Sequence, residues 1–391
     1  MKQQPTQQFI ATREAVFCLA FSPDGEQLAA GTGSFYGAGS LLLYPLRNDA
    51  NLVKVAGEAQ SLILSWQEPQ PKNPQLLAKP ERVSATALYF TPDSKQLWLA
   101  SSASRRQQGP LFCFDLTAGL LQLPPALQLP GMADQYPDGF LQLGQQLFIC
   151  CHSMDGCAKS HTYQADIDSF CAQPSHSSRL ILLKGQLITP GSSRPALQHG
   201  MRPDPRRYTF GLSFASVRPH SSASKHGEAP ITAATGFIAH QTNLTIPVRH
   251  AILAIAQDPN SDMFITGDSA GHLHRWWFNG QWQHQQIQPE KQPEVATRLD
   301  IADSIFAPDA IVALLYLPQN QGWLSLSANG LLIYWCDQQI RHYKQISELG
   351  SPRCMALHPT KPVLAIGLKH NAQLEGAGLI LVDISTWLVT E

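Results

Sequence analysis

The densest group of potential metal ligands lies between residues 150 and 161, where three cysteines and two histidines fall within twelve positions. Cys151, Cys157 and His161 have the ligand types and short spacing of a zinc site, and Cys171 offers a fourth thiol. Cys150 and Cys151, however, end an apolar run that predicts a β-strand, and successive strand side chains point to opposite faces. Because cysteine packs in cores as a small apolar residue, we expect no metal here and keep Cys151, Cys157 and His161 as the candidate ligands.

A second pattern, at residues 267–271, reads Gly-Asp-Ser-Ala-Gly and matches the Gly-x-Ser-x-Gly signature of a nucleophilic serine. That chemistry needs a strand, a sharp turn and a helix. Residues 272–278 alternate and are rich in aromatic side chains, which predicts a strand, so the glycines belong to a tight hairpin. Glycine-rich phosphate loops and paired carboxylates are not evident in the sequence. We therefore expect neither catalysis nor a cofactor.

Five long segments between predicted strands hold an excess of basic residues: 31–40, 101–110, 153–162, 189–207 and 369–378. Together they contain eight basic and three acidic residues, a net charge of +5 in a chain whose total is −1. Arginine predominates, and its guanidinium makes paired contacts with carboxylates or phosphates. The pattern predicts an acidic protein partner, with a nucleic-acid backbone as the alternative. The candidate partner-binding residues are Arg105, Arg106, Lys159, Arg194, Arg202, Arg206, Arg207 and Lys369.

The elements that position these residues repeat along the chain. A proline turn stands between two apolar runs at 22–25, 91–94, 258–261, 317–320 and 358–361. Proline at the second turn position sets φ at about −65° and ends a strand without needing a backbone N–H. With alternating apolar residues on either side, these turns predict many short antiparallel strands.

The third strand of most repeats ends in an aromatic residue or Asp, as at 112–115, 163–166, 275–277, 333–335 and 381–383. In this the chain resembles the WD-repeat family, whose repeats end that strand with a Trp-Asp pair. The full pair is not kept here, and the family's Gly-His pair before the first strand is missing. The resemblance implies a β-propeller, in which four-stranded sheets surround a channel. The family's Asp-His-Ser/Thr-Trp hydrogen-bond network is not carried over.

We therefore expect an all-β fold, a single seven-bladed β-propeller domain over residues 1–391, with eight blades as the alternative if the fourth is split. The predicted blades span residues 15–66, 83–123, 140–171, 179–248, 250–287, 311–346 and 354–384. The apolar segment 8–12 is expected to complete the last blade. Such closure joins the two chain ends and leaves no open sheet edge.

The five long segments fall between the second and third strands of blades seven, one, two, three and four, which are neighbours around the ring. Blades five and six keep a short hairpin at that place. Because equivalent connections lie on one face of a propeller, the segments predict a shared binding surface. Neutral variation is the alternative, since a longer loop costs little entropy.

The composition of the chain indicates the cellular compartment in which we expect it. Charged residues make up only 15% of the chain, against about 25% in typical soluble chains. The first residues lack the apolar core of a secretory signal, and uninterrupted apolar runs stay shorter than about 18 residues, so we expect no membrane span. Eight cysteines in 391 residues do not suggest a disulfide framework, which favours a reducing, cytoplasmic setting.

Together these observations predict a non-catalytic scaffold subunit that binds protein partners within a multi-subunit assembly. The predicted inner strands agree, because segments such as 17–20, 85–88 and 253–256 contain almost only small or apolar residues. One alternative is a propeller with a ligand or enzymatic site at the channel mouth. Another is a subunit that binds a nucleic-acid backbone through the basic segments.

Overall fold

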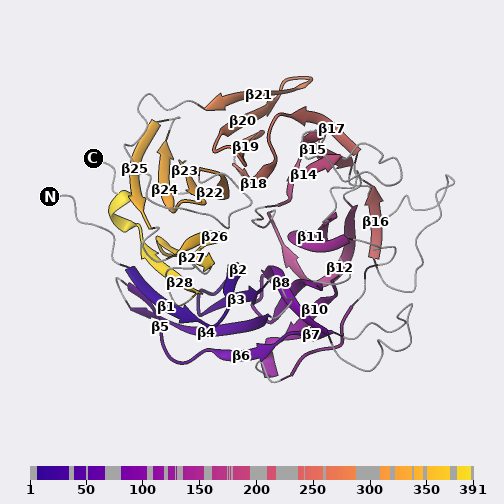
Figure 1. Ribbon diagram of the computed structural model, residues 1–391. Coiled ribbons are helices and arrows are strands. Elements are labelled where there is room, and N and C mark those ends of the chain that lie inside the picture. Colours follow the sequence, from indigo (N-terminus) through magenta and orange to yellow (C-terminus); the bar gives the residue numbers. More distant parts are fainter. Residues whose placement is uncertain are drawn as a thin grey trace, which may run out of the picture.

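The structure is a computed structural model, and its strands form sheets arranged in a ring (Figure 1). It describes residues 7–34, 39–49, 52–66, 81–103, 109–118, 122–127, 129, 135–153, 161–173, 175, 177, 179–193, 209–216, 237–241, 243–258, 261–287, 309–317, 322–336, 339–346, 350–369 and 377–388. Within these ranges, the helices lack the length and apolar character needed to cross a bilayer. Two of these helices are the short 3-10 helices η2 (Leu116–Ala118) and η6 (Ser385–Trp387).

The described strands form seven sheets, which we name blades one to seven. Blade one contains β2 (Ala15–Phe21), β3 (Gln27–Gly33), β4 (Ser40–Asp49) and β5 (Leu52–Val55), with β6 (Gln60–Ile63) paired to β4. Blade two contains β7 (Ser65–Trp66), β8 (Glu81–Phe90), β9 (Gln96–Ala103) and β10 (Leu111–Asp115). Blade three contains β11 (Gln135–Ser153), β12 (His161–Cys171) and β16 (Phe237–Gln241). Blade four contains β13 (Ile181–Leu183), β14 (Gln186–Ser193), β15 (Thr209–Ser216) and β17 (Asn243–Val248).

The remaining three blades have four strands each. Blade five contains β18 (Ile252–Gln257), β19 (Met263–Asp268), β20 (Leu273–Phe278) and β21 (Trp282–Ile287). Blade six contains β22 (Ile311–Leu317), β23 (Gly322–Ser327), β24 (Leu331–Cys336) and β25 (Gln339–Gln345). Blade seven contains β26 (Ser351–Leu357), β27 (Val363–Lys369), β28 (Ala377–Asp383) and β1 (Gln7–Thr12).

Blade seven joins the two ends of the described chain. β1 pairs antiparallel with β28 along its whole length, from Gln7 opposite Val382 to Thr12 opposite Ala377. The other side of β28 pairs with β27, so β1 covers an edge that would otherwise be open. The expected all-β propeller, closed by an N-terminal strand that completes the last blade, is therefore confirmed (Figure 1).

The strand nearest the central axis carries the same irregularity in five blades. The register of β2, β8, β18, β22 and β26 shifts by one residue against the second strand, after Val16, Ala85, Ile252, Ile311 and Pro352. A bulge inserts one unpaired residue and increases the local twist of its strand. Because the shift recurs at the same place, these inner strands bend alike around the axis.

The proline turns of the first two blades are held by the same local hydrogen bonds. The hydroxyl of Ser22 donates to the Asp24 carboxylate at 2.5 Å and accepts the amide of Gln27 at 2.9 Å. Thr91 does the same with Asp93 and Gln96 in blade two, at 2.7 and 3.0 Å. Ser, Thr and Asp favour turns because their short side chains can form hydrogen bonds with the backbone a few residues further along the chain.

The corresponding turn of blade seven contacts blade one through the side chain of His358, which is buried. Its Nε2 lies 3.2 Å from the Gly25 carbonyl oxygen, so that nitrogen carries the proton and donates. Its Nδ1 accepts the amides of Thr360 and Lys361 at 3.3 and 3.1 Å. Gly25 has φ +73°, and a Cβ there would lie 2.6 Å from the imidazole. Glycine is therefore required both by the turn and by the neighbouring ring.

Two strands lie outside the blades expected for them. β7, expected at the end of blade one, pairs with β8 and belongs to blade two. β16, expected inside blade four, pairs with β12 and supplies the outer strand of blade three, while β17 returns to pair with β15 in blade four. The physical reason is that a strand pairs with whichever free backbone edge lies beside it, which is the start of the inner strand β8 for β7 and the outer edge of β12 for β16, and local alternation does not encode that choice.

The core lies mainly between neighbouring blades. Side chains of blade four, such as Ile188 and Leu212, form one cluster with Phe264 and Trp276 of blade five. The rings of Phe264 and Trp276 stack at 5.8 Å, and Trp276 is 0% exposed. This packing fixes β19 and β20, the two strands that carry the site described next.

Candidate functional site

In blades one, two, four and seven the long segment joins the two strands that follow the inner strand, and in blade three it follows the single long strand β11. The five segments lie between β3 and β4, β9 and β10, β11 and β12, β14 and β15, and β27 and β28. Of the eight basic residues predicted to bind a partner, Lys369 lies within the described residues. It is half-buried at the end of β27, opposite Ser351 of β26. The other seven lie outside the described residues: Arg105, Arg106, Lys159, Arg194, Arg202, Arg206 and Arg207.

The structure describes only part of the cysteine-rich group at residues 150–161. Cys150 and Cys151 are both buried and pack into different core clusters, as strand alternation predicts. Burial raises the pKa of the Cys151 thiol well above its usual value, which disfavours the thiolate that a metal needs. Cys151 stands opposite His161 in the register of β11 and β12. Cys157 and the His161 side chain lie outside the described residues.

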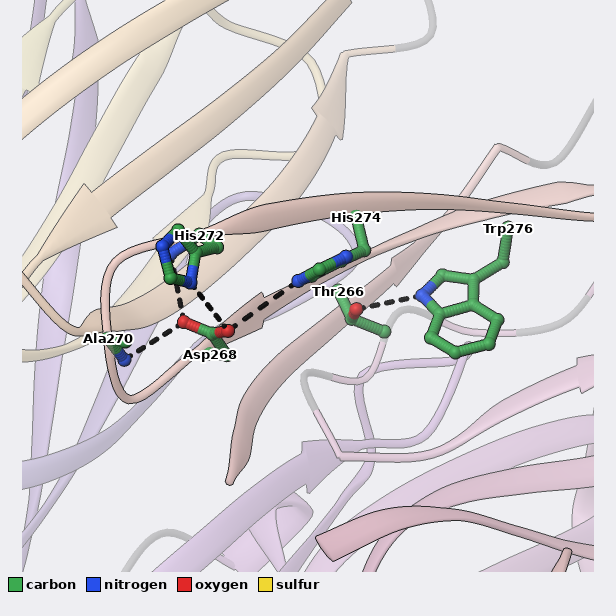
Figure 2. Close-up of polar contacts among 6 residues, drawn as sticks. All are labelled: Thr266, Asp268, Ala270, His272, His274 and Trp276. Atoms are coloured by element: carbon green, nitrogen blue, oxygen red, sulfur yellow. Dashed lines mark hydrogen bonds and ion pairs between the residues drawn. The ribbon is translucent and has the colours of Figure 1, made fainter. Parts of the chain in front are cut away.

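A different group of ligand types comes together at the hairpin between β19 and β20. Nδ1 of His272 lies 3.1 Å and Nε2 of His274 lies 3.5 Å from the same atom, Oδ2 of Asp268. Figure 2 shows the carboxylate between the two imidazoles. Among the described residues, this is the one group of three histidine, cysteine or acidic side chains whose ligand atoms all lie within 4.8 Å. Asp268 is buried, while the His272 and His274 side chains are 39% and 19% exposed.

The local sequence explains why these three side chains meet. β19 ends at Asp268, and Gly271, with φ +89°, turns the chain back. His272 and His274 are two positions apart, so alternation places them on the same face of the returning strand. The hairpin expected at residues 267–271 is thereby confirmed, because β20 and not a helix follows the turn.

The second carboxylate oxygen of Asp268 is held by the backbone. Oδ1 accepts the amides of Ala270 and His272 at 2.9 and 2.8 Å (Figure 2). Burial raises the pKa of Asp268, but hydrogen bonds from His274, from those two amides and from His272 outweigh it and lower the pKa to about 2. The carboxylate is therefore ionised at neutral pH.

Aromatic side chains of blade five pack beside the group formed by Asp268, His272 and His274. The Trp276 indole donates to the Thr266 hydroxyl at 2.8 Å, and the His284 ring stacks on the indole at 4.4 Å. His284 in turn lies 5.6 Å from the His274 ring. Burial, with the nearby His274, lowers the pKa of His284, so that imidazole stays neutral. His250 lies on the other side, 5.5 Å from the ring of His272.

This arrangement corrects one expectation about the hydrogen-bond network. Two contacts of the kinds found in that network do form in blade five: the Trp276–Thr266 hydrogen bond and the contact between Asp268 and His274. The histidines in contact with the carboxylate come from the third strand and its turn, whereas the family's histidine precedes the first strand. His250 has that preceding position and packs against His272.

Sequence reasoning missed this cluster because it treated residues 267–271 only as a turn. The available signal was a carboxylate followed at four and six residues by two histidines of an alternating strand. Histidines two apart on a strand share a face, and with a nearby carboxylate they offer three ligands of the kinds that zinc prefers.

The comparisons with known proteins agree with this architecture. The WD domain, G-beta repeat family matches residues 3–36, a span that holds β1, β2 and β3. No curated protein matches the chain. The solved structure of U3-55K has 10% sequence identity and a TM-score of 0.54, over 96% of this chain and 98% of that one. At that identity the likeness is one of fold. With one repeat matched at its start and its strands closed into a ring, this chain is a β-propeller that is similar to the WD-repeat family.

Proposed function

We propose that this propeller is a non-catalytic scaffold subunit of a larger, cytoplasmic assembly, and that it binds a protein partner through the long segments of blades seven, one, two, three and four. The observation that carries the proposal is the placement of these segments. They lie between β3 and β4, β9 and β10, β11 and β12, β14 and β15, and β27 and β28, in five blades that are consecutive around the ring. Blades five and six have short hairpins there.

The charge of the segments indicates the kind of partner. Eight basic and three acidic residues give them a net charge of +5, while the whole chain carries −1. Such an excess attracts an acidic surface and makes association depend on ionic strength. Arginine outnumbers lysine six to two among these residues, which suits paired contacts with carboxylates. We therefore propose an acidic protein surface as the partner.

The test compares two full-length variants with the wild type. The first replaces Arg105, Arg106, Arg206 and Arg207 by Gln. The control replaces four exposed basic residues outside the long segments by Gln, namely Arg13, Arg47, Lys54 and Arg341. Each protein is used in affinity capture from its native extract, followed by mass spectrometry, and captured proteins are then measured for direct binding across a salt series.

We expect the first variant to lose proteins that the wild type and the control both retain, and the retained binding to weaken as salt rises. Equal capture by all three proteins would refute the role of these arginines. Loss of RNA or DNA binding in place of an acidic protein would favour the nucleic-acid alternative. Shortening residues 194–207 to a Gly-Ser linker tests whether the blade-four segment contributes separately.

A further inference from the structure

We propose that Asp268, His272 and His274 form a binding site for a divalent transition-metal ion of the Zn²⁺ class. This site is separate from the long segments proposed to bind a partner. It lies on the short hairpin of blade five and uses one carboxylate oxygen and two imidazole nitrogens (Figure 2). Imidazole with carboxylate is a ligand set that suits zinc, copper, nickel and iron.

The distances fit a metal ion. Zinc lies about 2.0–2.2 Å from nitrogen and oxygen ligands, so ligand atoms at the corners of a tetrahedron are about 3.3–3.6 Å apart. Oδ2 of Asp268 lies 3.1 Å from Nδ1 of His272 and 3.5 Å from Nε2 of His274. The three ligand atoms all lie within 4.8 Å of one another, so a movement of the two partly exposed histidine side chains brings them to bonding distance of one ion.

The carboxylate is already oriented for this role. The amides of Ala270 and His272 hold Oδ1 and leave Oδ2 facing the two imidazoles. Outer contacts that hold a ligand in place contribute strongly to metal affinity. Among the residues that the structure describes, the imidazoles have no such hydrogen bond but lie against neighbouring rings, with His272 5.5 Å from His250 and His274 5.6 Å from His284.

Blade six shows that the hairpin does not need these ligands. In both blades a Trp indole donates to a Ser or Thr hydroxyl at 2.8 Å, Trp276 to Thr266 and Trp335 to Ser325. In the strand register, Ser327 occupies the place of Asp268, opposite Ile311 as Asp268 is opposite Ile252.

The histidine positions of blade six are apolar. Ile333 stands opposite Ser325 as His274 stands opposite Thr266, and Leu331 begins β24 after the equivalent turn. A β-hairpin of the same kind thus forms with Ser, Leu and Ile in place of Asp, His and His. The buried charge and the two histidines of blade five are therefore additions to the fold, and a bound cation accounts for them.

Metal binding requires each imidazole to give up the proton that now faces Asp268. In a neutral histidine that proton moves to the other ring nitrogen. Nδ1 of His274 is buried and, within the described residues, has no hydrogen-bond partner, so it can take the proton without breaking a protein hydrogen bond. The resulting N–H lacks a protein acceptor there, which lowers the net affinity for the metal. The exposure of His272 leaves a path for the ion and a further position for water.

The experiment titrates the full-length, metal-free protein with Zn²⁺ by calorimetry and with Co²⁺ by visible absorption. Three variants are compared: His272→Gln, His274→Gln, and the triple change D268S/H272L/H274I, which installs the residues of blade six. His342→Gln, on β25 of blade six, is the matched control for loss of a strand histidine. Cys151→Ser tests the cysteine-rich group. Circular dichroism verifies that each variant is folded.

We expect one saturable site in the wild type, in His342→Gln and in Cys151→Ser. Each single ligand variant should bind at least ~10-fold more weakly, since loss of an outer contact alone costs about 10- to 100-fold. The triple variant should fold without binding the metal. A Co²⁺ spectrum free of thiolate charge transfer is also expected. The proposal is overturned by no saturable binding, by binding that the blade-five variants retain, or by binding that Cys151→Ser abolishes.

Discussion

The bond between Trp276 and Thr266 offers a sharp test of how blade five is held together. Replacing Thr266 by Val keeps the shape of the side chain and removes the oxygen that accepts the indole N–H at 2.8 Å. Trp276 is 0% exposed, so water cannot replace that acceptor without opening the core. The variant therefore leaves one buried donor without a partner.

The expected magnitude follows from that burial. An unsatisfied buried donor costs about 1–3 kcal/mol, whereas removal of both partners is much less costly. Thr266→Val should thus lower the free energy of unfolding by about 1–3 kcal/mol. Trp276→Phe also loses packing, so its own cost should be larger. The double variant should lose less free energy of unfolding than the sum of the two single losses, by about 1 kcal/mol or more.

The assay is urea unfolding followed by circular dichroism, which does not depend on the fluorescence of Trp276. Ser325→Ala in blade six is a parallel test, because Trp335 donates to Ser325 at the same distance of 2.8 Å. The reasoning fails if Thr266→Val lies within about 0.5 kcal/mol of the wild type, the range of ordinary surface changes. It also fails if the double-variant costs are simply additive.

Three further predictions concern the turns and the closure of the ring. Gly25→Ala should lower the melting temperature more than Gly144→Ala, because both have positive φ but only a Cβ at residue 25 meets the His358 ring, at 2.6 Å; equal shifts in thermal unfolding would contradict this. Burial and nearby Lys361 lower the pKa of His358, outweighing its bond to Gly25, so stability should be complete above the ordinary histidine pKa of about 6.5 and fall as the pH drops below it. Thermal unfolding between pH 5 and 8 checks this, and His358→Asn should lose that step. Deletion of residues 1–12 should lower the melting temperature and expose the edge of β28 to self-association; a monomer of unchanged stability in gel filtration and thermal unfolding would count against the closure.

Much of the architecture could be predicted from local patterns. The proline turns, such as 22–25 and 91–94, mark strand ends because proline lacks a donor and presets its own φ. Alternating apolar residues then indicate which segments pair as neighbours. A ring needs its open edge covered, which predicts that segment 8–12 completes the last blade, and β1 does pair with β28 there.

The candidate metal site could be predicted only in part. Asp268, His272 and His274 are close in the sequence, and strand alternation alone puts both histidines on one face. The sequence does not show that both nitrogens meet one carboxylate oxygen, since that depends on the hairpin turn at Gly271. His250 and His284 join the cluster only through packing between strands.

Alternation and turn chemistry within a few residues encode the strand repeat and the hairpin at residues 267–271, and the resemblance to the WD-repeat family implied the closed ring. The sheet that receives each outer strand depends on tertiary packing, as β16 in blade three shows. The tertiary structure also decides how His358 of blade seven fits over Gly25 of blade one, 333 residues away. Such contacts depend on the register and packing of distant strands, and no local pattern encodes them.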